Sequence, residues 1–427
     1  MKHVAVIGGG IAGIAASLRL AASGARVSLY ERSNRLGGRA GSFDDPSLDE
    51  PIDNCQHVAL GCCPAYLGLL SELGVADSLA WTGSYTYIDG DGKRFHLPIP
   101  RWPAPLHGLP LLVKAGFLSI GERLGIARAM RTIGSTDRET HRGTSFAAWL
   151  NAQGQSDRAT RRFWGPIVVS ACNATPETCD AASALHVFQD GFLRSASDAR
   201  MAVPTVPLRT LYDSVPDGLA HAGGEVRFGA HITGLTEGGA LLRTGDAIKA
   251  DAVILALPFH AAAGLIETIG EKGRRVAADL RSLKHSPIVA VHAEFERPVT
   301  SLPHAVLLDA DFDWIFLKDN GRRVHAVASA ADGLVDRSAD ELVTGLVDEI
   351  ARRFGPNRVT WARAVKERRA TFLVEPGFDD RRPACDALAP RHWLAGDYTQ
   401  TGWPATMEGA TRSGQAAADA VIGHLGL

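Results

Sequence analysis

Three glycines near the N-terminus have the spacing of a loop that holds the phosphates of a dinucleotide. Gly8, Gly10 and Gly13 form G-x-G-x-x-G between a strand-like apolar run and a helical pattern, and Glu31 ends the next strand-like run. In such a loop the first glycine permits a tight turn, the second lets the backbone approach a pyrophosphate, and the third lets helix and strand pack closely. The unpaired N–H groups of the helix N-terminus then favour the anion.

The acidic residue after the second strand indicates which dinucleotide binds. The Glu31 carboxylate would accept hydrogen bonds from the ribose hydroxyls and would repel a 2′-phosphate, although Arg32 beside it weakens that repulsion. NADP is therefore disfavoured. A glycine-rich turn that binds nothing is the alternative. The predicted contacts of this first segment are Gly8, Gly10, Ile11, Ala12, Gly13, Glu31 and Arg32.

A second glycine pair follows in Arg35-Leu36-Gly37-Gly38-Arg39. Two adjacent glycines let backbone amides come near a ligand, and an arginine offers a forked donor to phosphate oxygens. The segment resembles the R-x-G-G-R signature of the amine oxidase and carotenoid desaturase superfamily of flavoproteins. That resemblance implies FAD as the cofactor, with Gly37, Gly38 and Arg39 beside its diphosphate.

The end of the chain extends the resemblance. Ala395-Gly396-Asp397, followed by residues 402–410, is similar to the C-terminal flavin segment of the superfamily. There the aspartate binds the ribityl or pyrophosphate region, and the dipole of a helix N-terminus stabilises the reduced flavin. No cysteine lies between 395 and 411, so non-covalent FAD is expected. The FAD contacts implied are Gly396, Asp397, Ala405, Thr406 and Met407, with Ile232 near the adenine.

The run from Asp53 to Cys62 resembles one group of enzymes within this superfamily. Its sequence is similar to the D-N-G-Q-H-x-x-x-G-C loop of hydroxysqualene dehydroxylases, flavoenzymes of hopanoid pathways. Cys55 stands where these enzymes usually have glycine. If the loop needs a backbone conformation that only glycine adopts readily, cysteine would strain it. The wider resemblance covers nearly the whole chain, including 163–166 and 173–176. The loop implies that Asn54, Gln56 and His57 lie at the flavin.

The reaction that this loop implies is the reductive loss of a hydroxyl group. Reduced FAD gives a hydride to an allylic carbon of hydroxysqualene, the hydroxyl leaves as water, and squalene forms. Hydroxide is a poor leaving group, so a proton donor is needed within hydrogen-bond distance. His57 is the first candidate because imidazole can be protonated near neutral pH, and Glu408 and Asp53 follow. The alternative for His57 is a structural role in the loop.

Aromatic side chains are available for a dry site that stabilises a developing carbocation. Packing in an ordinary hydrophobic core is the alternative, since that is what aromatic residues usually do. The predicted substrate-lining residues are Trp164, Phe188, Phe192 and Trp314.

The elements that must position these residues are a parallel sheet and a second, partly helical region. A β-α-β pattern covers residues 3–30, and strand-like runs at 223–228, 252–257 and 392–397 would rejoin the same sheet. We therefore predict an α/β fold, in which a Rossmann-like FAD-binding domain of the glutathione-reductase and amine-oxidase type carries an inserted α+β substrate domain. The predicted FAD domain comprises 1–85, 203–285 and 387–427, and the predicted substrate domain comprises 86–202 and 286–386.

Composition and charge limit the partners and the compartment. A net charge of -2 over 427 residues gives no sign of nucleic-acid binding. Six cysteines without a C-x-x-C pair predict reduced thiols and no metal site. The chain opens on a strand rather than on a secretory signal, so a cytoplasmic protein is expected. No apolar run is long enough to span a bilayer.

Residues 98–120 interleave large apolar side chains with prolines, Arg101 and Lys114. This pattern predicts a peripheral segment at the inner face of a membrane, where a water-insoluble triterpene would enter. A proline-broken loop packed on the substrate domain is the alternative. The sequence shows no second nucleotide motif that would bind NADH. The flavin could therefore be reduced by an external electron donor or reductase, or by a loosely bound nicotinamide.

Three other functions fit parts of the sequence. A carotenoid or phytoene desaturase would use the flavin oxidatively on a polyene, and only the loop at 53–62 separates it from the first hypothesis. An amine oxidase is disfavoured because Trp403 supplies one ring of an aromatic cage and Gln400 and Thr401 supply none. A non-enzymatic escort of prenylated proteins is disfavoured because the complete phosphate-binding glycine set is present.

Overall fold

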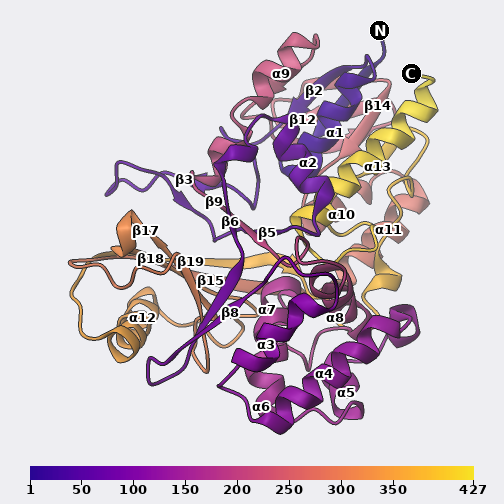
Figure 1. Ribbon diagram of the computed structural model, residues 1–427. Coiled ribbons are helices and arrows are strands. Elements are labelled where there is room, and N and C mark those ends of the chain that lie inside the picture. The colour runs from indigo at the N-terminus through magenta and orange to yellow at the C-terminus, as the bar shows by residue number, and fades with distance from the viewer.

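A five-stranded parallel sheet joins three distant parts of the chain. The computed structural model describes residues 1–427, and the first strands lie beside the last helix in the upper half of Figure 1. The strand order is β10-β2-β1-β14-β20, and every neighbouring pair is parallel. The strands are β1 (His3–Ile7), β2 (Arg26–Tyr30), β10 (Glu225–Arg227), β14 (Ala252–Leu255) and β20 (His392–Leu394). The predicted α/β fold with a Rossmann-like sheet is therefore confirmed.

Both faces of this sheet are covered. Successive residues of a strand point to opposite faces, so each face carries its own apolar side chains, which other elements must bury. The covering elements are α1 (Ile11–Ala22), α13 (Met407–Leu425), α10 (Phe259–Ile266), α11 (Gly270–Ser282) and a small antiparallel sheet of β11 (Ile232–Thr236), β12 (Gly239–Leu242) and β13 (Ala247–Lys249). Val4 and Val6 share a core with α1 and α13. Ala5 and Ile7 share a second core with α10, α11 and the small sheet. The result is a three-layer domain.

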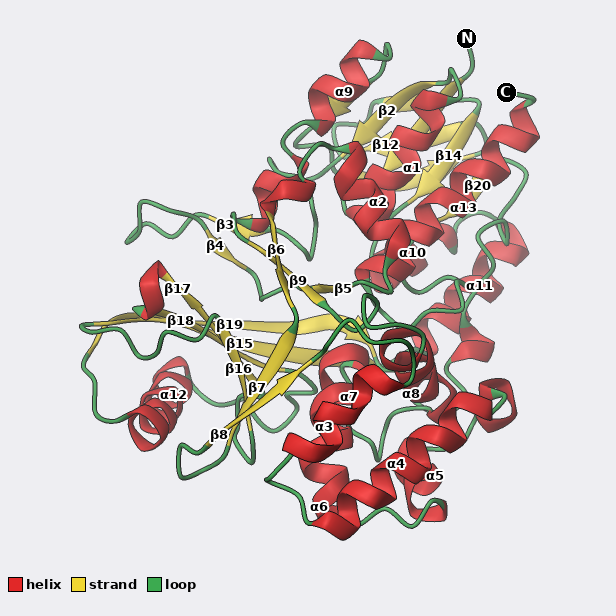
Figure 2. Cartoon of the chain, viewed as in Figure 1, coloured by secondary structure: helices red, strands yellow, loops and turns green.

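A seven-stranded sheet forms the other half of the molecule (Figure 2). Its order is β19-β15-β18-β17-β16-β7-β8, and only β16 and β7 run parallel. The strands are β7 (Ser84–Ile88), β8 (Arg94–Pro98), β15 (His285–Phe295), β16 (His304–Leu307), β17 (Trp314–Lys318), β18 (Arg323–Ala328) and β19 (Val359–Phe372). An early hairpin thus completes a sheet made mostly of late strands.

The two faces of this sheet meet different helices. One face packs on α12 (Ala339–Phe354), which begins with a capping box between Ser338 and Glu341 and buries an apolar stripe at helical spacing. The other face meets a helical layer on the opposite side of the sheet (Figure 1). That layer consists of α3 (Leu109–Lys114), α4 (Ile120–Ser135), α5 (Phe146–Ala152), α6 (Asp157–Ala159), α7 (Gly165–Cys172) and α8 (Ala181–Phe188).

Short elements connect the two halves. They are the strands β3 (Ser42–Phe43), β4 (Ile52–Asp53), β5 (Ala59–Leu60), β6 (Leu79–Thr82) and β9 (Met201–Pro204). The helices α2 (Pro64–Glu72) and α9 (Val215–His221) instead pack in the core that β1 shares with α1 and α13. β9 pairs with β5 and with β6, so three segments of the chain meet at this junction. The predicted domain limits stay a proposal. The limits between 85 and 86, between 202 and 203 and between 285 and 286 fall inside β7, β9 and β15, so each of them belongs at an end of its strand.

One helical segment of the helical layer is irregular. Thr160–Trp164 forms a wider π-helical turn between α6 and α7, so the three elements run on as one helical segment over 157–172. The segment 98–120 contains α3 and ends where α4 begins. None of the helices combines the length and the hydropathy needed to cross a bilayer.

Candidate active site

The glycine loop between β1 and α1 leaves room for a ligand at one position. A Cβ atom added at Gly8 would lie 2.3 Å from the Ala256 carbonyl oxygen, and one added at Gly13 would lie 1.9 Å from the Gly8 carbonyl oxygen. Side chains at these two positions would push α1 away from the strands. A Cβ atom at Gly10 meets no protein atom within 4 Å. A pyrophosphate therefore fits beside Gly10.

The second glycine pair lies directly against this loop. The Gly37 N–H donates to the Gly9 carbonyl oxygen at 2.9 Å, and a Cβ atom at Gly38 would lie 3.1 Å from the Gly10 Cα. Gly37 and Gly38 have φ of +96° and +59°, a region that favours glycine. α1 begins here at Ile11 and Ala12 with no side-chain cap and no acidic residue in its first turn. Two backbone turns and a helix N-terminus converge on one anion site, which fits the FAD diphosphate.

Glu31 is held by the backbone beside the first glycine loop. Its carboxylate accepts hydrogen bonds from the N–H groups of Gly9 and Ser33, both at 2.8 Å. Each oxygen retains a lone pair for a ribose hydroxyl. The segment that leads to Ile232 runs alongside, because the Ala230 N–H donates to the Glu31 carbonyl oxygen at 2.9 Å. Ile232 follows two residues later as the first residue of β11, and its contact with adenine stays a prediction. Arg32 is exposed.

Arg39 joins the glycine cradle to the C-terminal flavin segment. Its guanidinium donates to the Asp397 carboxylate at 2.6 Å and to the Ala370 carbonyl oxygen at 2.8 Å. Protein acceptors thus engage two of its nitrogens, where the sequence predicted phosphate oxygens. Gly396 N–H donates to Ser413 Oγ at 2.8 Å, which anchors the same segment on α13.

Arg382 is a buried member of the site that no motif indicated. It donates to the Asp397 carbonyl oxygen, to Thr401 Oγ1 and to the Asp379 carboxylate, each at 3.0 Å. These bonds fix the loop that precedes α13. That helix starts at Met407 after Ala405 and Thr406, and Thr406 Oγ1 accepts a hydrogen bond from the Gly409 N–H at 3.1 Å. A buried arginine outside any motif leaves no signal in a single sequence.

Glu408 caps a helix rather than facing substrate. Its buried carboxylate accepts hydrogen bonds from Ala65 N–H at 3.2 Å and Tyr66 N–H at 2.8 Å, at the N-terminus of α2, and from Arg412 at 2.6 Å. Three donors occupy this carboxylate, so it acts as an acceptor that ties α13 to α2. The geometry does not suit the predicted role of Glu408 as a proton donor.

Asp53 is likewise surrounded by donors. Its carboxylate accepts hydrogen bonds from Ser42 Oγ at 2.7 Å and Leu208 N–H at 3.0 Å, and it forms an ion pair with Lys318 at 3.2 Å. Asp53 is 3% exposed, so these contacts replace water almost completely. The structure assigns Asp53 to holding the loop in place, and its predicted role as a proton donor is not favoured.

His57 is the one predicted proton donor with a free ring nitrogen. Its Nδ1 donates to the Cys55 carbonyl oxygen at 2.9 Å, and its Nε2 makes no hydrogen bond within the protein. Burial lowers the pKa of His57, so the neutral form prevails at neutral pH. On the same loop, Gln56 Oε1 is buried without a partner, and Asn54 N–H donates to the Gly41 carbonyl oxygen at 3.0 Å. An orphaned acceptor suits a bound group that carries N–H or O–H donors.

Cys55 occupies the position of the usual glycine without strain. It is not among the residues with positive φ, and its buried side chain packs on Ala290 and Val327. The loop therefore does not need glycine at this position. Burial raises the pKa of the Cys55 thiol to about 12, which makes it unreactive at neutral pH. All six cysteines are free thiols, as the sequence predicted.

Two of the four predicted substrate-lining aromatics belong to the core of the helical layer. Trp164 and Phe188 are fully buried with ring centroids 4.9 Å apart, and the Trp164 indole N–H donates to Gln155 Oε1 at 2.9 Å. Other side chains already cover both rings, so the geometry does not favour this pair as substrate-lining residues. Phe192 and Trp314 are partly exposed and stay candidates. Tyr85, which no motif indicated, lies between them, with ring centroids 6.5 and 6.2 Å away.

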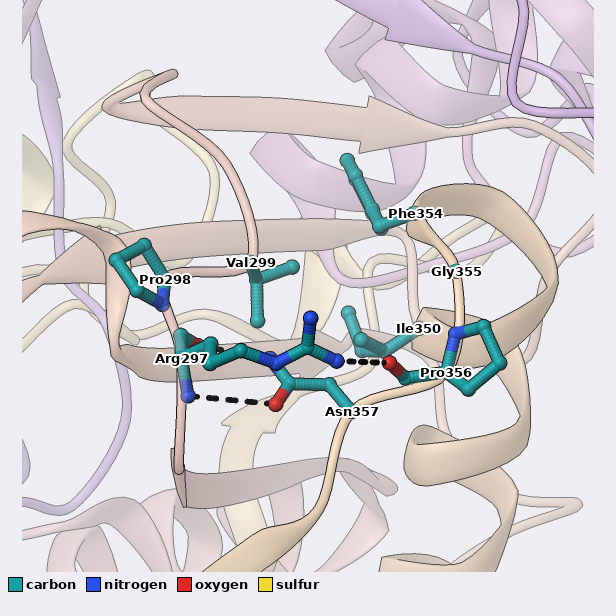
Figure 3. A pocket seen from close by; sticks show the side chains of 8 residues that line it. All are labelled: Arg297, Pro298, Val299, Ile350, Phe354, Gly355, Pro356 and Asn357. Atoms are coloured by element: carbon teal, nitrogen blue, oxygen red, sulfur yellow. Dashed lines mark hydrogen bonds between the residues drawn. The ribbon is translucent and has the colours of Figure 1, made fainter.

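A separate surface pocket of about 70 Å³ takes no part in this arrangement (Figure 3). Ile350 and Phe354 line it from α12, on the face of the seven-stranded sheet that points away from the loop at 53–57. Arg297 closes one side through hydrogen bonds to Asn357 Oδ1 at 3.3 Å and to the Pro356 carbonyl oxygen at 2.8 Å.

Comparison with known proteins identifies the family. The model of flavin-containing amine oxidoreductases matches residues 11–422. The chain belongs to this family. A hydroxysqualene dehydroxylase from Rhodopseudomonas palustris is 30% identical over 99% of this chain and 98% of its own. A probable zeta-carotene desaturase from Synechococcus elongatus is 24% identical over 98% of each chain.

A solved structure of an oxidoreductase from Methanosarcina mazei has the same fold. It covers 98% of this chain and 100% of its own, with a TM-score of 0.74 and 16% identity. Membership of the family makes this protein an FAD-dependent oxidoreductase. The cradle of two glycine turns, Glu31 and the start of α13 is where its residues would hold FAD.

Replacing Gly10 by alanine is expected to weaken FAD binding without unfolding the protein. The added methyl group meets no protein atom, but it enters the space that the pyrophosphate needs. We expect an affinity loss of about tenfold, or about 1.4 kcal/mol. Flavin absorbance per protein and far-ultraviolet circular dichroism measure the two effects. Gly68→Ala, in α2, also adds a methyl group without contacts and should bind FAD normally. Full FAD affinity in Gly10→Ala would place the pyrophosphate elsewhere.

Proposed function

We propose that this flavoenzyme reduces hydroxysqualene to squalene with loss of water. The loop from Asp53 to His57 carries the proposal. Asn54 bonds to the Gly41 carbonyl oxygen, two residues after Arg39, and Cys55 packs on the seven-stranded sheet. The similarity over the full chain to a protein named hydroxysqualene dehydroxylase supports the same reaction.

The reaction needs a hydride, a proton and a dry surrounding. FAD, when bound and reduced, supplies the hydride to the allylic carbon, whose C–O bond breaks. The protein must protonate the departing oxygen and exclude water from the positive charge that develops on carbon. Partly exposed Trp314 stacks on buried Phe316 with ring centroids 5.6 Å apart, and buried Tyr85 joins Trp314 to partly exposed Phe192. We call these four rings the aromatic surface, of which Trp314 and Phe192 are the accessible part. Their π-faces suit a carbocation.

His57 is our choice for the proton donor. Its Nδ1 is committed to the Cys55 carbonyl oxygen, so a proton can be gained and released only at Nε2. The competing carboxylates, Asp53 and Glu408, are each held by three donors. Burial lowers the pKa of His57, so protonation costs free energy at neutral pH and leaves a stronger acid.

A desaturase that oxidises a polyene is the second candidate. The likeness to a protein named zeta-carotene desaturase supports it, at lower identity than the likeness to the dehydroxylase. The two reactions move the hydride in opposite directions. A desaturase reacts with oxidised flavin, and a dehydroxylase reacts with reduced flavin. The physiological electron source is proposed to be an external donor or reductase, because the sequence has no second nucleotide motif.

The direction of hydride transfer is tested with a single turnover. The holoprotein is reduced with dithionite under anaerobic conditions and mixed with hydroxysqualene. We expect the flavin to reoxidise and squalene to form in equal amount, measured by absorbance and by mass spectrometry. The oxidised holoprotein mixed with phytoene is the comparison reaction. Bleaching of the flavin by phytoene, with no reoxidation by hydroxysqualene, would replace the dehydroxylase by a desaturase.

The proton donor is tested by the pH dependence of the same turnover. The pKa of His57 lies below its ordinary value, so the protonated fraction rises about tenfold for each unit by which the pH falls from 8 towards 6.5. The rate constant of flavin reoxidation should rise in parallel. His57→Gln should react at least about 100-fold more slowly, with a rate constant that does not depend on pH. An unchanged pH profile in this variant would assign the proton to another group.

We also propose that the segment around α3 rests on a membrane surface. Val113 and Ile120 are each 71% exposed, whereas Leu111 and Leu112 pack on the helical-layer core and hold the segment in place. His107 Nε2 bonds to the Phe192 carbonyl oxygen at 2.8 Å, which links the segment to the aromatic surface. The exposed apolar side chains of this segment are Trp102, Leu106, Leu109, Val113, Ile120 and Leu124.

Replacing Val113 by glutamate is expected to reduce liposome binding by about tenfold. Burial of a valine side chain is worth about 1.5 to 3 kcal/mol, and a carboxylate removes that gain. Co-sedimentation with liposomes measures binding, and flavin absorbance should show unchanged FAD content. Phe228→Glu, at a 43% exposed position after β10 in the FAD domain, is the control. Equal sedimentation of the Val113→Glu and unsubstituted proteins would contradict the membrane proposal.

A further inference from the structure

A row of polar and aromatic rings crosses the seven-stranded sheet. The cross-strand register pairs His292 with His325, His325 with Phe316, and Phe316 with His304. Residues paired directly across neighbouring strands lie on the same face of a sheet, so all four rings share one face. Val291, beside His292 in the strand, belongs to the core under α12. The row therefore occupies the opposite face.

The loop at 53–57 lies over one end of this row. Cys55 packs on Ala290 and Val327, which form the cross-strand pair next to His292 and His325. The Asp53 carbonyl oxygen bonds to His292 Nε2 at 3.0 Å. The loop thus contacts this face of the sheet at two points, through the Asp53 carbonyl oxygen at His292 and through the Cys55 side chain at the neighbouring pair.

His325 is the member of the row without any hydrogen bond. It is 2% exposed, neither ring nitrogen has a partner, and its ring stacks on His292 with centroids 3.8 Å apart. Its neighbours differ, because His292 and His304 each bond to a backbone carbonyl oxygen. A buried donor or acceptor without a partner costs about 1 to 3 kcal/mol. Burial lowers the pKa of His325 well below its ordinary value, so the ring is neutral, with one donor and one acceptor.

Two acceptors on the loop also lack partners. Gln56 Oε1 is buried without a hydrogen bond, and the neutral His57 ring leaves Nε2 as a bare acceptor. Together, His325, Gln56 and His57 present one N–H donor and three acceptors without partners. A hydroxyl group, which donates one hydrogen bond and accepts two, satisfies such a set. A hydrocarbon satisfies none of it.

We propose that His325 binds the hydroxyl group of the substrate and makes the site selective for an alcohol over a hydrocarbon. This inference rests on the proposed function, because it concerns the same site. His325 is 2% exposed, so its ring is now covered. The side chains that cover it must therefore move aside when the hydroxyl group binds. Sites that hydrogen-bond a hydroxyl discriminate strongly against analogues that lack it, since the polar groups then stay unpaired. The product squalene loses this contact, which favours its release.

The test compares the binding of hydroxysqualene and squalene to the oxidised holoprotein, followed by perturbation of the flavin absorbance. We expect the alcohol to bind at least about tenfold more tightly, the equivalent of one satisfied hydrogen-bonding group. His325→Leu should reduce this preference to less than about threefold. His325→Gln keeps a donor and an acceptor and should restore it. His304→Leu, in the same row but bonded to the Ser84 carbonyl oxygen, should leave the preference unchanged.

Flavin absorbance per protein and the melting temperature confirm that each variant is folded. Equal affinity for both lipids in the unsubstituted protein, or an undiminished preference in His325→Leu, would overturn the inference. A His325→Gln variant as impaired as His325→Leu would also overturn it, because hydrogen bonding would then not be the cause. A preference that depends on His325, without squalene formation in the single-turnover experiment, would refute the proposed reaction and leave the inference standing.

Discussion

The close approach of α1 to the ends of β1 and β14 is the constraint on which the rest of the structure depends. Gly13 touches the Gly8 carbonyl oxygen, and Gly8 touches the Ala256 carbonyl oxygen, so the helix N-terminus is held at the edge of the sheet. Once it is there, the second glycine turn can lie against the first. Arg39 then meets Asp397 from the far end of the chain. Every contact of the FAD cradle follows from that first contact.

Most buried charge in the site serves to hold segments together. Asp53, Asp397 and Glu408 each accept hydrogen bonds from groups that are distant in sequence, and burying a carboxylate without such donors would be costly. The groups without partners are neutral, namely the imidazole of His325 and the amide oxygen of Gln56. Neutral groups can stay unpaired at a cost that a fold tolerates, and unpaired charges cannot. The polar groups that remain free to bind a ligand are therefore the neutral ones.

The glycine cradle could be predicted from the sequence because its requirements are local. Gly8, Gly10 and Gly13 serve backbone geometry within one turn, and the pattern records them directly. His325 could not be found in this way, because its meaning depends on its pairing with His292 across two strands. The capping contact of Glu408 leaves no signal in the sequence for a similar reason, since its partners lie at the start of α2.

The assembly of the parallel sheet sets the order in which the chain can fold. β1 pairs with β14, and β14 pairs with β20, so the sheet closes only when residues 392–394 are available. Contacts between such distant segments make folding slow and leave apolar strand faces uncovered in incomplete chains. The C-terminal part of the predicted FAD site is therefore the last to become available during synthesis. Once bound, the cofactor stabilises the folded state by mass action, so the stability of the protein depends on the concentration of FAD.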